Sequence, residues 1–188
     1  RYFTAAVDQR RTGTHLDQVQ RLELLMNQVG VDANFSPARK AALLKEEATG
    51  APAGAMVLPD GRVVTGKTSN LLGAASSLLM NALKGVSGVD EDLFVISDEV
   101  IEPICKLKKN TLHANNPRLH SDETLLALSV SSATDPVAKE LIDHAGDLHG
   151  CDAFFSVIIS ETDEKLYRTL GINVCCEPKY EKRRFFHK

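Results

Sequence analysis

The sequence lacks several features that would point directly to a function. It contains no tryptophan, aromatic residues make up 5% of it, and its four cysteines form no CxxC pair. No apolar run approaches the roughly 18 to 20 residues that a membrane-spanning helix needs. The N-terminus lacks the charged and then apolar pattern of a signal peptide. These absences predict a cytoplasmic protein with no membrane partner and with buried thiols rather than disulfides.

The charge balance excludes a further class of partner. The chain has 22 Lys and Arg against 25 Asp and Glu, a net charge of −3, so it has no excess of basic residues. Proteins that bind the phosphate backbone need such an excess, and we therefore expect no nucleic-acid partner. At 188 residues the chain is long enough to bury a hydrophobic core of its own.

Helical spacing and capping residues divide the chain near residue 50. One amphipathic helix is expected before Gly30, and a second begins at Ser36 and Pro37 and ends at Gly50. Gly and Pro then interrupt both helical and strand patterns over residues 50–54. We predict three parts: a helical segment that continues from an upstream region, 1–50, an αβα domain, 51–180, and a C-terminal tail, 181–188.

The second part is predicted to be a three-layer αβα sandwich with a mixed sheet, to which the first part adds a small helical layer. Two β-prone runs joined by Asp60 and Gly61 indicate a hairpin. A helix that is apolar on almost every face follows over 69–84 and should be buried. Apolar strands separated by helices imply a covered sheet. The remaining strands are expected at 93–96, 153–159 and 172–176, and the remaining helices at 98–109, 122–133, 136–145 and after Ser160.

The hairpin also contains a nucleotide-binding motif. Gly61 to Thr68 read GRVVTGKT and satisfy the P-loop pattern GxxxxGKT, and an acidic stretch follows at 93–99. In this alternative the chain is an ATPase or kinase-type domain that uses ATP with magnesium. A P-loop must curl around phosphate, however, whereas Val63 and Val64 favour an extended chain. We therefore favour the hairpin and predict no cofactor.

Two polar segments are candidates for a ligand site. The start of the expected helix at 69–84 could bind a small anion, because free N–H groups and the helix dipole attract negative charge there. A second polar loop precedes the helix at 122–133 and could clamp an anion or move a proton. Plain helix capping and a structurally satisfied loop are the alternatives. The candidate residues are Lys67, Thr68, Ser69 and Asn70 in the first segment, and Arg118 and His120 in the second.

The sequence offers no complete catalytic group and no convincing metal site. His144, Asp147, His149 and Cys151 lie close together in the sequence, but their spacing matches no closed zinc pattern. We therefore predict no bound metal. The basic and aromatic tail is expected to be solvated or loosely docked.

Four separated motifs lie at 58–69, 96–104, 116–119 and 170–173. Together they resemble one bacterial family, the family known as domain of unknown function 1846. The resemblance implies that the chain is the C-terminal region of a longer protein, whose N-terminal region would be its partner. No protease motif supports a peptidase activity for this part of it.

The order of elements also resembles the opening of the cytidine-deaminase fold. Those enzymes hold zinc through a His or Cys near a Glu at the first helix and through Pro-Cys-x-x-Cys at the next. Here the first helix supplies no such residues, and the second offers Pro103 and Cys105 with Lys108 in place of the second Cys. The resemblance therefore implies the fold without the deaminase chemistry.

We expect an uncharacterised C-terminal domain of a larger cytosolic bacterial protein. It would contribute an interface or part of a small anionic-ligand site. The P-loop domain described above is one alternative, and a purely structural or oligomerisation module, with a second copy as partner, is another.

Overall fold

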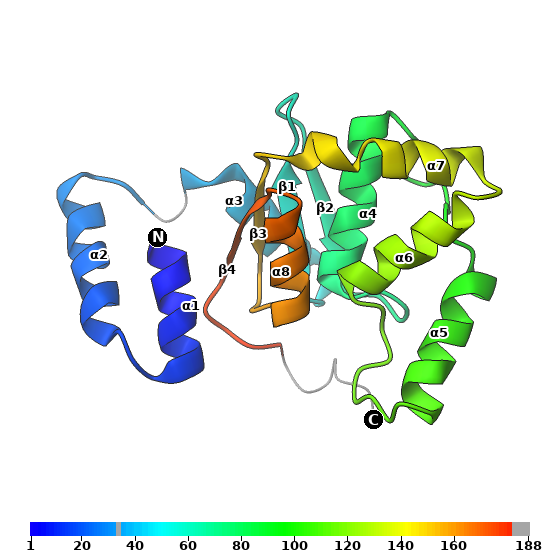
Figure 1. The fold of residues 1–188 in the computed structure, drawn as a ribbon. Helices are drawn as coiled ribbons and strands as arrows, with labels where there is room; N and C mark the ends of the chain where they lie inside the picture. The colour runs from blue at the N-terminus through cyan, green and yellow to red at the C-terminus, as the bar shows by residue number, and fades with distance from the viewer. Residues whose placement is uncertain (33–34, 182–188) are drawn as a thin grey trace.

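A four-stranded mixed sheet covered by helices on both faces forms the centre of the protein (Figure 1). The computed structural model describes residues 1–32 and 35–181. The predicted three-layer architecture is confirmed. The strands are β1 Ala53–Val57, β2 Val63–Lys67, β3 Asp152–Phe155 and β4 Asn173–Cys176. The helices are α1 Tyr2–Thr12, α2 Leu16–Gln28, α3 Pro37–Thr49, α4 Ala74–Ser87, α5 Asp98–Asn110, α6 Ser121–Ser131, α7 Pro136–Asp143, η2 Ala145–Leu148 and α8 Glu161–Thr169.

The strands are arranged in the order β2-β1-β3-β4. Strand β1 runs antiparallel to both of its neighbours, so that Ala55 pairs with Thr65 on one side and with Phe154 on the other. Strands β3 and β4 are parallel and are connected through α8. A parallel pair requires such a crossover, because the chain must return to the same end of the sheet.

The two faces of the sheet have separate hydrophobic layers. On one face, Ala38 and Ala42 of α3 pack against Ala55 and Phe154. On the other face, α4 and α8 bury the larger part of the core, which includes Tyr167. The hydroxyl of this fully buried tyrosine donates to the carbonyl of Ala75 at 2.8 Å and so joins α8 to the first turn of α4. Helix α3, which we assigned to the N-terminal part, thus forms one layer of the sandwich.

The P-loop motif is an antiparallel hairpin in the structure. Gly61 has a φ of 84°, as the tight turn requires, and the following residues form β2. Gly66 lies so close to α4 that a Cβ atom built on it would be 2.2 Å from the backbone nitrogen of Leu78. Each glycine of the motif therefore has an architectural role. The P-loop alternative lacks the phosphate-binding loop that it needs, because that stretch is an extended strand.

The helix expected to begin at Ser69 begins instead at Ala74, with Gly73 as its N-cap. Two contacts hold the preceding segment away from helical geometry. The Ser69 Oγ accepts the N–H of Leu72 at 3.0 Å, and the Leu71 carbonyl accepts the N–H of Leu119 at 2.9 Å. The prediction that Lys67, Thr68, Ser69 and Asn70 lie at the start of this helix is therefore wrong.

The prediction of a strand at residues 93–96 is also wrong, because this segment is irregular. Val95 and Ile96 are both buried, whereas Leu93 and Phe94 are 44% and 91% exposed. Burial therefore does not alternate along the segment as it does along a half-buried strand. The predicted tail, 181–188, lies outside the described residues except for Glu181.

Replacing Gly66 by alanine tests the close approach of β2 to α4. We expect Gly66→Ala to lower the free energy of unfolding by about 3 kcal/mol, because backbone atoms must move to admit the methyl group. Gly146→Ala is the control, since a Cβ atom there meets nothing within 4 Å. Urea denaturation of both variants measures the difference. Wild-type stability of Gly66→Ala would contradict the packing described here.

Candidate functional site

Three helices begin around one cavity of about 560 Å³. Their N-cap residues, Gly73 for α4, His120 for α6 and Ser160 for α8, all line it. We call it the His120 cavity. Figure 1 shows the starts of the three helices gathered at one end of the sheet. Helix N-termini carry unsatisfied N–H groups and a partial positive charge, so this convergence favours negative charge in the cavity.

Asp163 supplies one negative charge at this point. Its carboxylate is buried and binds three side chains: Ser160 Oγ donates to Oδ2 at 2.6 Å, Ser121 Oγ donates to Oδ1 at 2.7 Å, and His120 Nδ1 lies 3.1 Å from Oδ2. The Ser121 N–H also donates to Oδ1, at 2.8 Å. Asp163 therefore compensates the N-terminus of α6 and fixes the ring of His120.

These contacts shift the pKa values of both partners. The hydrogen bond to Asp163 raises the pKa of His120, and this effect exceeds the opposing effect of burial. Burial alone would raise the pKa of the Asp163 carboxyl, but the hydrogen bonds from His120, Ser160 and Ser121 outweigh it and lower the pKa. The pair thus favours a protonated imidazole beside an ionised carboxylate.

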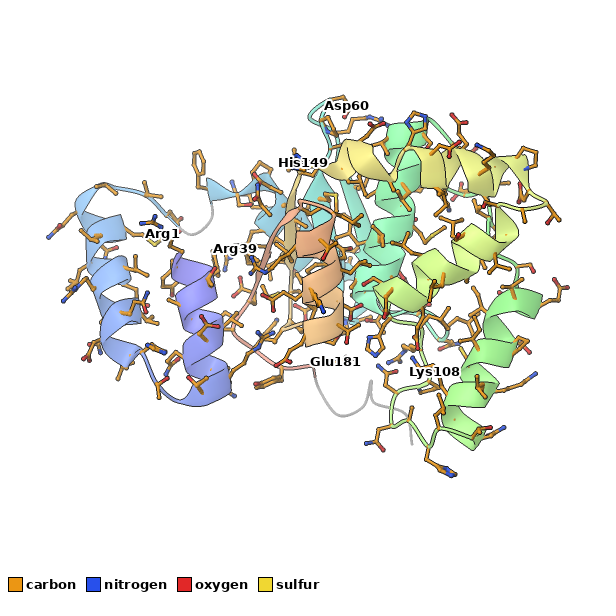
Figure 2. All side chains as sticks on the ribbon, viewed as in Figure 1. Arg1, Arg39, Asp60, Lys108, His149 and Glu181 are labelled. Atoms are coloured by element: carbon orange, nitrogen blue, oxygen red, sulfur yellow. The ribbon has the colours of Figure 1, made fainter. Side chains whose placement is uncertain are left out.

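The backbone of His120 is held by α5 and α6. The His120 N–H donates to Glu123 Oε2 at 2.8 Å, which closes a capping box. Lys108 Nζ donates to the same oxygen at 2.6 Å and to the Arg118 carbonyl at 2.7 Å. Lys108 is buried, so its charge is satisfied through these contacts. Figure 2 shows Lys108, a residue of α5, in the same lower part of the molecule as Glu181.

Two groups in the cavity keep hydrogen-bonding capacity. The ring of His120 is bound to Asp163 through Nδ1. Its other nitrogen, Nε2, makes no hydrogen bond with the described residues. Helix α4 has no side-chain cap, and the N–H groups of Ala74 and Ala75 have no partner in the described part of the chain. Both alanines line the cavity. The cavity therefore combines hydrogen-bond donors with one unfilled helix terminus.

Arg118 is a structural member of this site. Its side chain is buried, and its Nε donates to the Ser69 carbonyl at 2.6 Å. Its Nη1 lies 3.8 Å from Glu181 Oε1. Burial raises the pKa of Glu181, and the charge of Arg118 opposes this shift.

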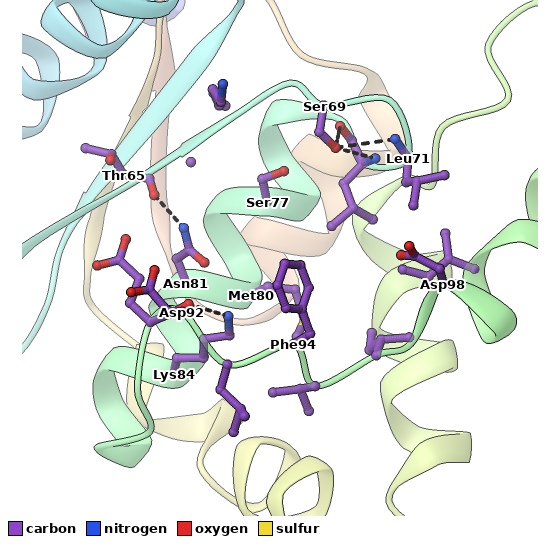
Figure 3. Close-up of a pocket in the computed structure, with 18 of the residues that line it drawn as sticks. Thr65, Ser69, Leu71, Ser77, Met80, Asn81, Lys84, Asp92, Phe94 and Asp98 are labelled. Carbon is purple, nitrogen blue, oxygen red and sulfur yellow. Dashed lines mark hydrogen bonds between the residues drawn. The ribbon is translucent and has the colours of Figure 1, made fainter.

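The structure divides the predicted site residues between two cavities. Arg118 and His120 lie together in the His120 cavity, where Thr68 joins them. Lys67 and Ser69 line a second cavity of about 660 Å³, which we call the edge cavity because it lies beside β2 (Figure 3). Asn70 is exposed and lines neither.

Sequence reasoning missed Asp163 as a site residue. It is separated from His120 by 43 positions, and only the fold brings the two together. The available signal was the capping pattern of Ser160 and Asp163, which the structure confirms: Ser160 Oγ accepts the Asp163 N–H at 3.1 Å. The pattern locates a helix start without revealing that the carboxylate turns toward a second helix.

The cysteines, possible metal ligands and helix lengths bear on other kinds of site. All four cysteines are free, and Cys151 and Cys176 are buried. Within residues 1–32 and 35–181, no three His, Cys, Asp or Glu side chains are grouped as metal ligands. In the same part of the chain, no helix is both long and apolar enough to cross a membrane.

The model of the family "Domain of unknown function DUF1846, C-terminal" matches residues 34–186. The chain belongs to this family. The match includes α3, the whole sheet, and Asp163 with the three residues that bind its carboxylate, His120, Ser121 and Ser160. The resemblance found in the separated sequence motifs is thereby confirmed.

Longer bacterial proteins are similar over this chain. UPF0371 proteins of Corynebacterium efficiens and Corynebacterium diphtheriae are both 43% identical over all 188 residues, and one of Streptococcus pyogenes serotype M5 is 38% identical over the same length. In each case the match covers 100% of this chain and 38% of the relative. In these relatives the domain is thus part of a longer chain, and their names state no activity.

A titration of the histidine ring tests the His120 and Asp163 contact. We expect NMR to give His120 a pKa above its ordinary value of 6.5. In Asp163→Asn the pKa should fall to that value or below, because burial remains while the carboxylate is lost. His144, whose pKa is raised mainly by a hydrogen bond to Asp147, is an internal control and should not change.

The same shift predicts a stability profile. Because the folded pKa of His120 lies above the unfolded one, its protonation stabilises the protein below about pH 6.5, and this contribution is lost as the pH rises through the folded pKa. Urea denaturation at several pH values should show that the free energy of unfolding falls less over this range in Asp163→Asn than in the wild type. An equal loss in both proteins would contradict the contact.

Proposed function

We propose that this domain provides a binding site for a small anion, a carboxylate or a phosphate, in the His120 cavity of a longer bacterial protein. The observation that supports the proposal is the convergence of three helix N-termini on a cavity in which Asp163 compensates only two of them. The start of α4 has neither an acidic residue in its first turn nor a side-chain cap. A ligand oxygen would accept from that terminus as Asp163 does from α6.

The charges in the cavity are consistent with this role. The raised pKa of His120 extends the pH range over which the imidazole is cationic, and Nε2 is then a donor. Arg11 also lines the cavity, although it is paired with Glu164 at 2.9 Å. One anion could therefore bind both His120 and the first turn of α4.

A second role, contact with the rest of the longer protein, is supported by a different surface. Helix α2 and its C-cap residue Val29 have exposed apolar side chains. Exposed apolar surfaces of this kind commonly mark protein interfaces. The residues are Leu16, Leu24, Leu25 and Val29, with exposed fractions of 53%, 63%, 48% and 69%.

Thermal-shift measurements on the longer protein test the anion site. Inorganic phosphate and succinate should each raise the melting temperature by a few degrees relative to chloride at equal ionic strength, since a ligand that binds only the folded state stabilises it. The shift should decrease as the pH rises through the folded pKa of His120, because the imidazole then loses its proton.

Two matched histidine variants give the specificity of the test. His120→Gln should lose most of the anion-dependent shift, because it removes the cationic donor from the cavity. His144→Gln should keep it, since that histidine lies at the end of α7 and binds Asp147 and Glu140 instead. The absence of any anion-specific shift, or equal shifts in both variants, would rule out the proposed site.

A further inference from the structure

Strand β2 is an edge of the sheet, and its register with β1 defines which backbone groups face outward. The N–H of Leu58 donates to the Arg62 carbonyl at 2.8 Å, and the N–H of Thr68 donates to the Pro52 carbonyl at 2.8 Å. In an antiparallel pair, bonded and non-bonded positions alternate. The even-numbered residues of β2 therefore bond to β1, and the odd-numbered ones, Val63, Thr65 and Lys67, direct their N–H and C=O groups away from the sheet.

One contact confirms this orientation. Asn81 of α4 donates its Nδ2 to the Thr65 carbonyl at 2.8 Å (Figure 3). The N–H groups of Val63, Thr65 and Lys67 have no partner among residues 1–32 and 35–181. An edge strand with unpaired groups of this kind is a template for a further strand.

The surface beside this edge suits an extended polypeptide. Thr65, Gly66 and Lys67 line the edge cavity, whose apolar wall includes Leu72 and Met80. Phe94 also lines this cavity and is 91% exposed, and Figure 3 shows its ring near Met80. Added strands are bound through main-chain hydrogen bonds, while neighbouring pockets receive alternate side chains.

We propose that an extended segment of the longer protein, from outside this chain, pairs with β2 as a fifth strand and places an apolar side chain in the edge cavity. The occupant is assigned from length: this chain covers 38% of its relatives, so most of each relative lies outside it and is tethered to it. A tethered segment binds at a high effective concentration, which favours it over a separate molecule. The proposal does not depend on the anion site.

Residue-resolved hydrogen exchange of the longer protein tests the added strand. The amides of Val63, Thr65 and Lys67 should exchange at least about 100-fold more slowly than unstructured amides. The amides of Val64 and Gly66 should be protected in any case, because they bond to β1. Unprotected exchange at the three odd-numbered positions beside protected even-numbered ones would overturn the proposal.

A variant pair at Lys67 identifies the contact, and dilution identifies the occupant. Lys67→Pro removes one outward N–H while keeping the bonds to β1, and the preceding residue, Gly66, tolerates a following proline. It should reduce the protection of Thr65 at least about 10-fold, whereas Lys67→Ala, which keeps the N–H, should not. Equal protection in the two variants would count against the strand.

Protection that disappears on dilution would assign the edge to a second copy of the chain and overturn the proposal.

Discussion

The buried carboxylate of Asp163 is the interaction on which the functional end of the molecule depends. A charge of this kind is tolerated only when hydrogen bonds and opposite charge replace water. Here it accepts four hydrogen bonds when His120 Nδ1 carries a proton, and they come from Ser121 of α6 and from the N-cap residues of α6 and α8. Loss of one partner from such a buried network commonly costs about 3 to 5 kcal/mol.

This constraint links the geometry of the site to the geometry of the fold. Asp163 lies in the first turn of α8 and binds the first residue of α6, and Tyr167, one turn further along α8, binds the first turn of α4. Lys108 extends the same connection to α5 through Glu123. The position of His120 is therefore determined by four helices at once, so its ring is oriented before any ligand arrives. Such preorganisation reduces the ordering cost of binding.

The sequence was most informative where a single local interaction decides the structure. The caps at Ser36 and Ser160 and the turn at Gly61 were predictable because the groups that bond are two or three residues apart. The layered architecture was predictable from the order of such elements, whereas separated sequence motifs carried the family resemblance.

Errors arose where contacts distant in the sequence override local preference. Ser69 has the chemistry of a helix cap, yet the bridge between Leu72 and Leu119 delays the helix until Ala74. Residues 93–96 have the composition of a strand, but they do not pair with β2, which is an edge strand of the sheet, or with any other described strand. His120 was a candidate from its loop alone, whereas its partner Asp163 could not be found without the fold.

The central pairing of the sheet has a consequence for how the molecule forms. The Ala53 N–H is bound to the Ser156 Oγ across 103 positions of sequence, and β1 pairs with β3 over a similar separation. The chain loses the entropy of closing this long loop before the contacts between β1 and β3 can form. This order of events slows folding. During synthesis, the hairpin leaves the ribosome long before β3 exists. Until then one side of β1 has no partner, so the nascent chain carries a second open edge for the time it takes to translate about 100 residues.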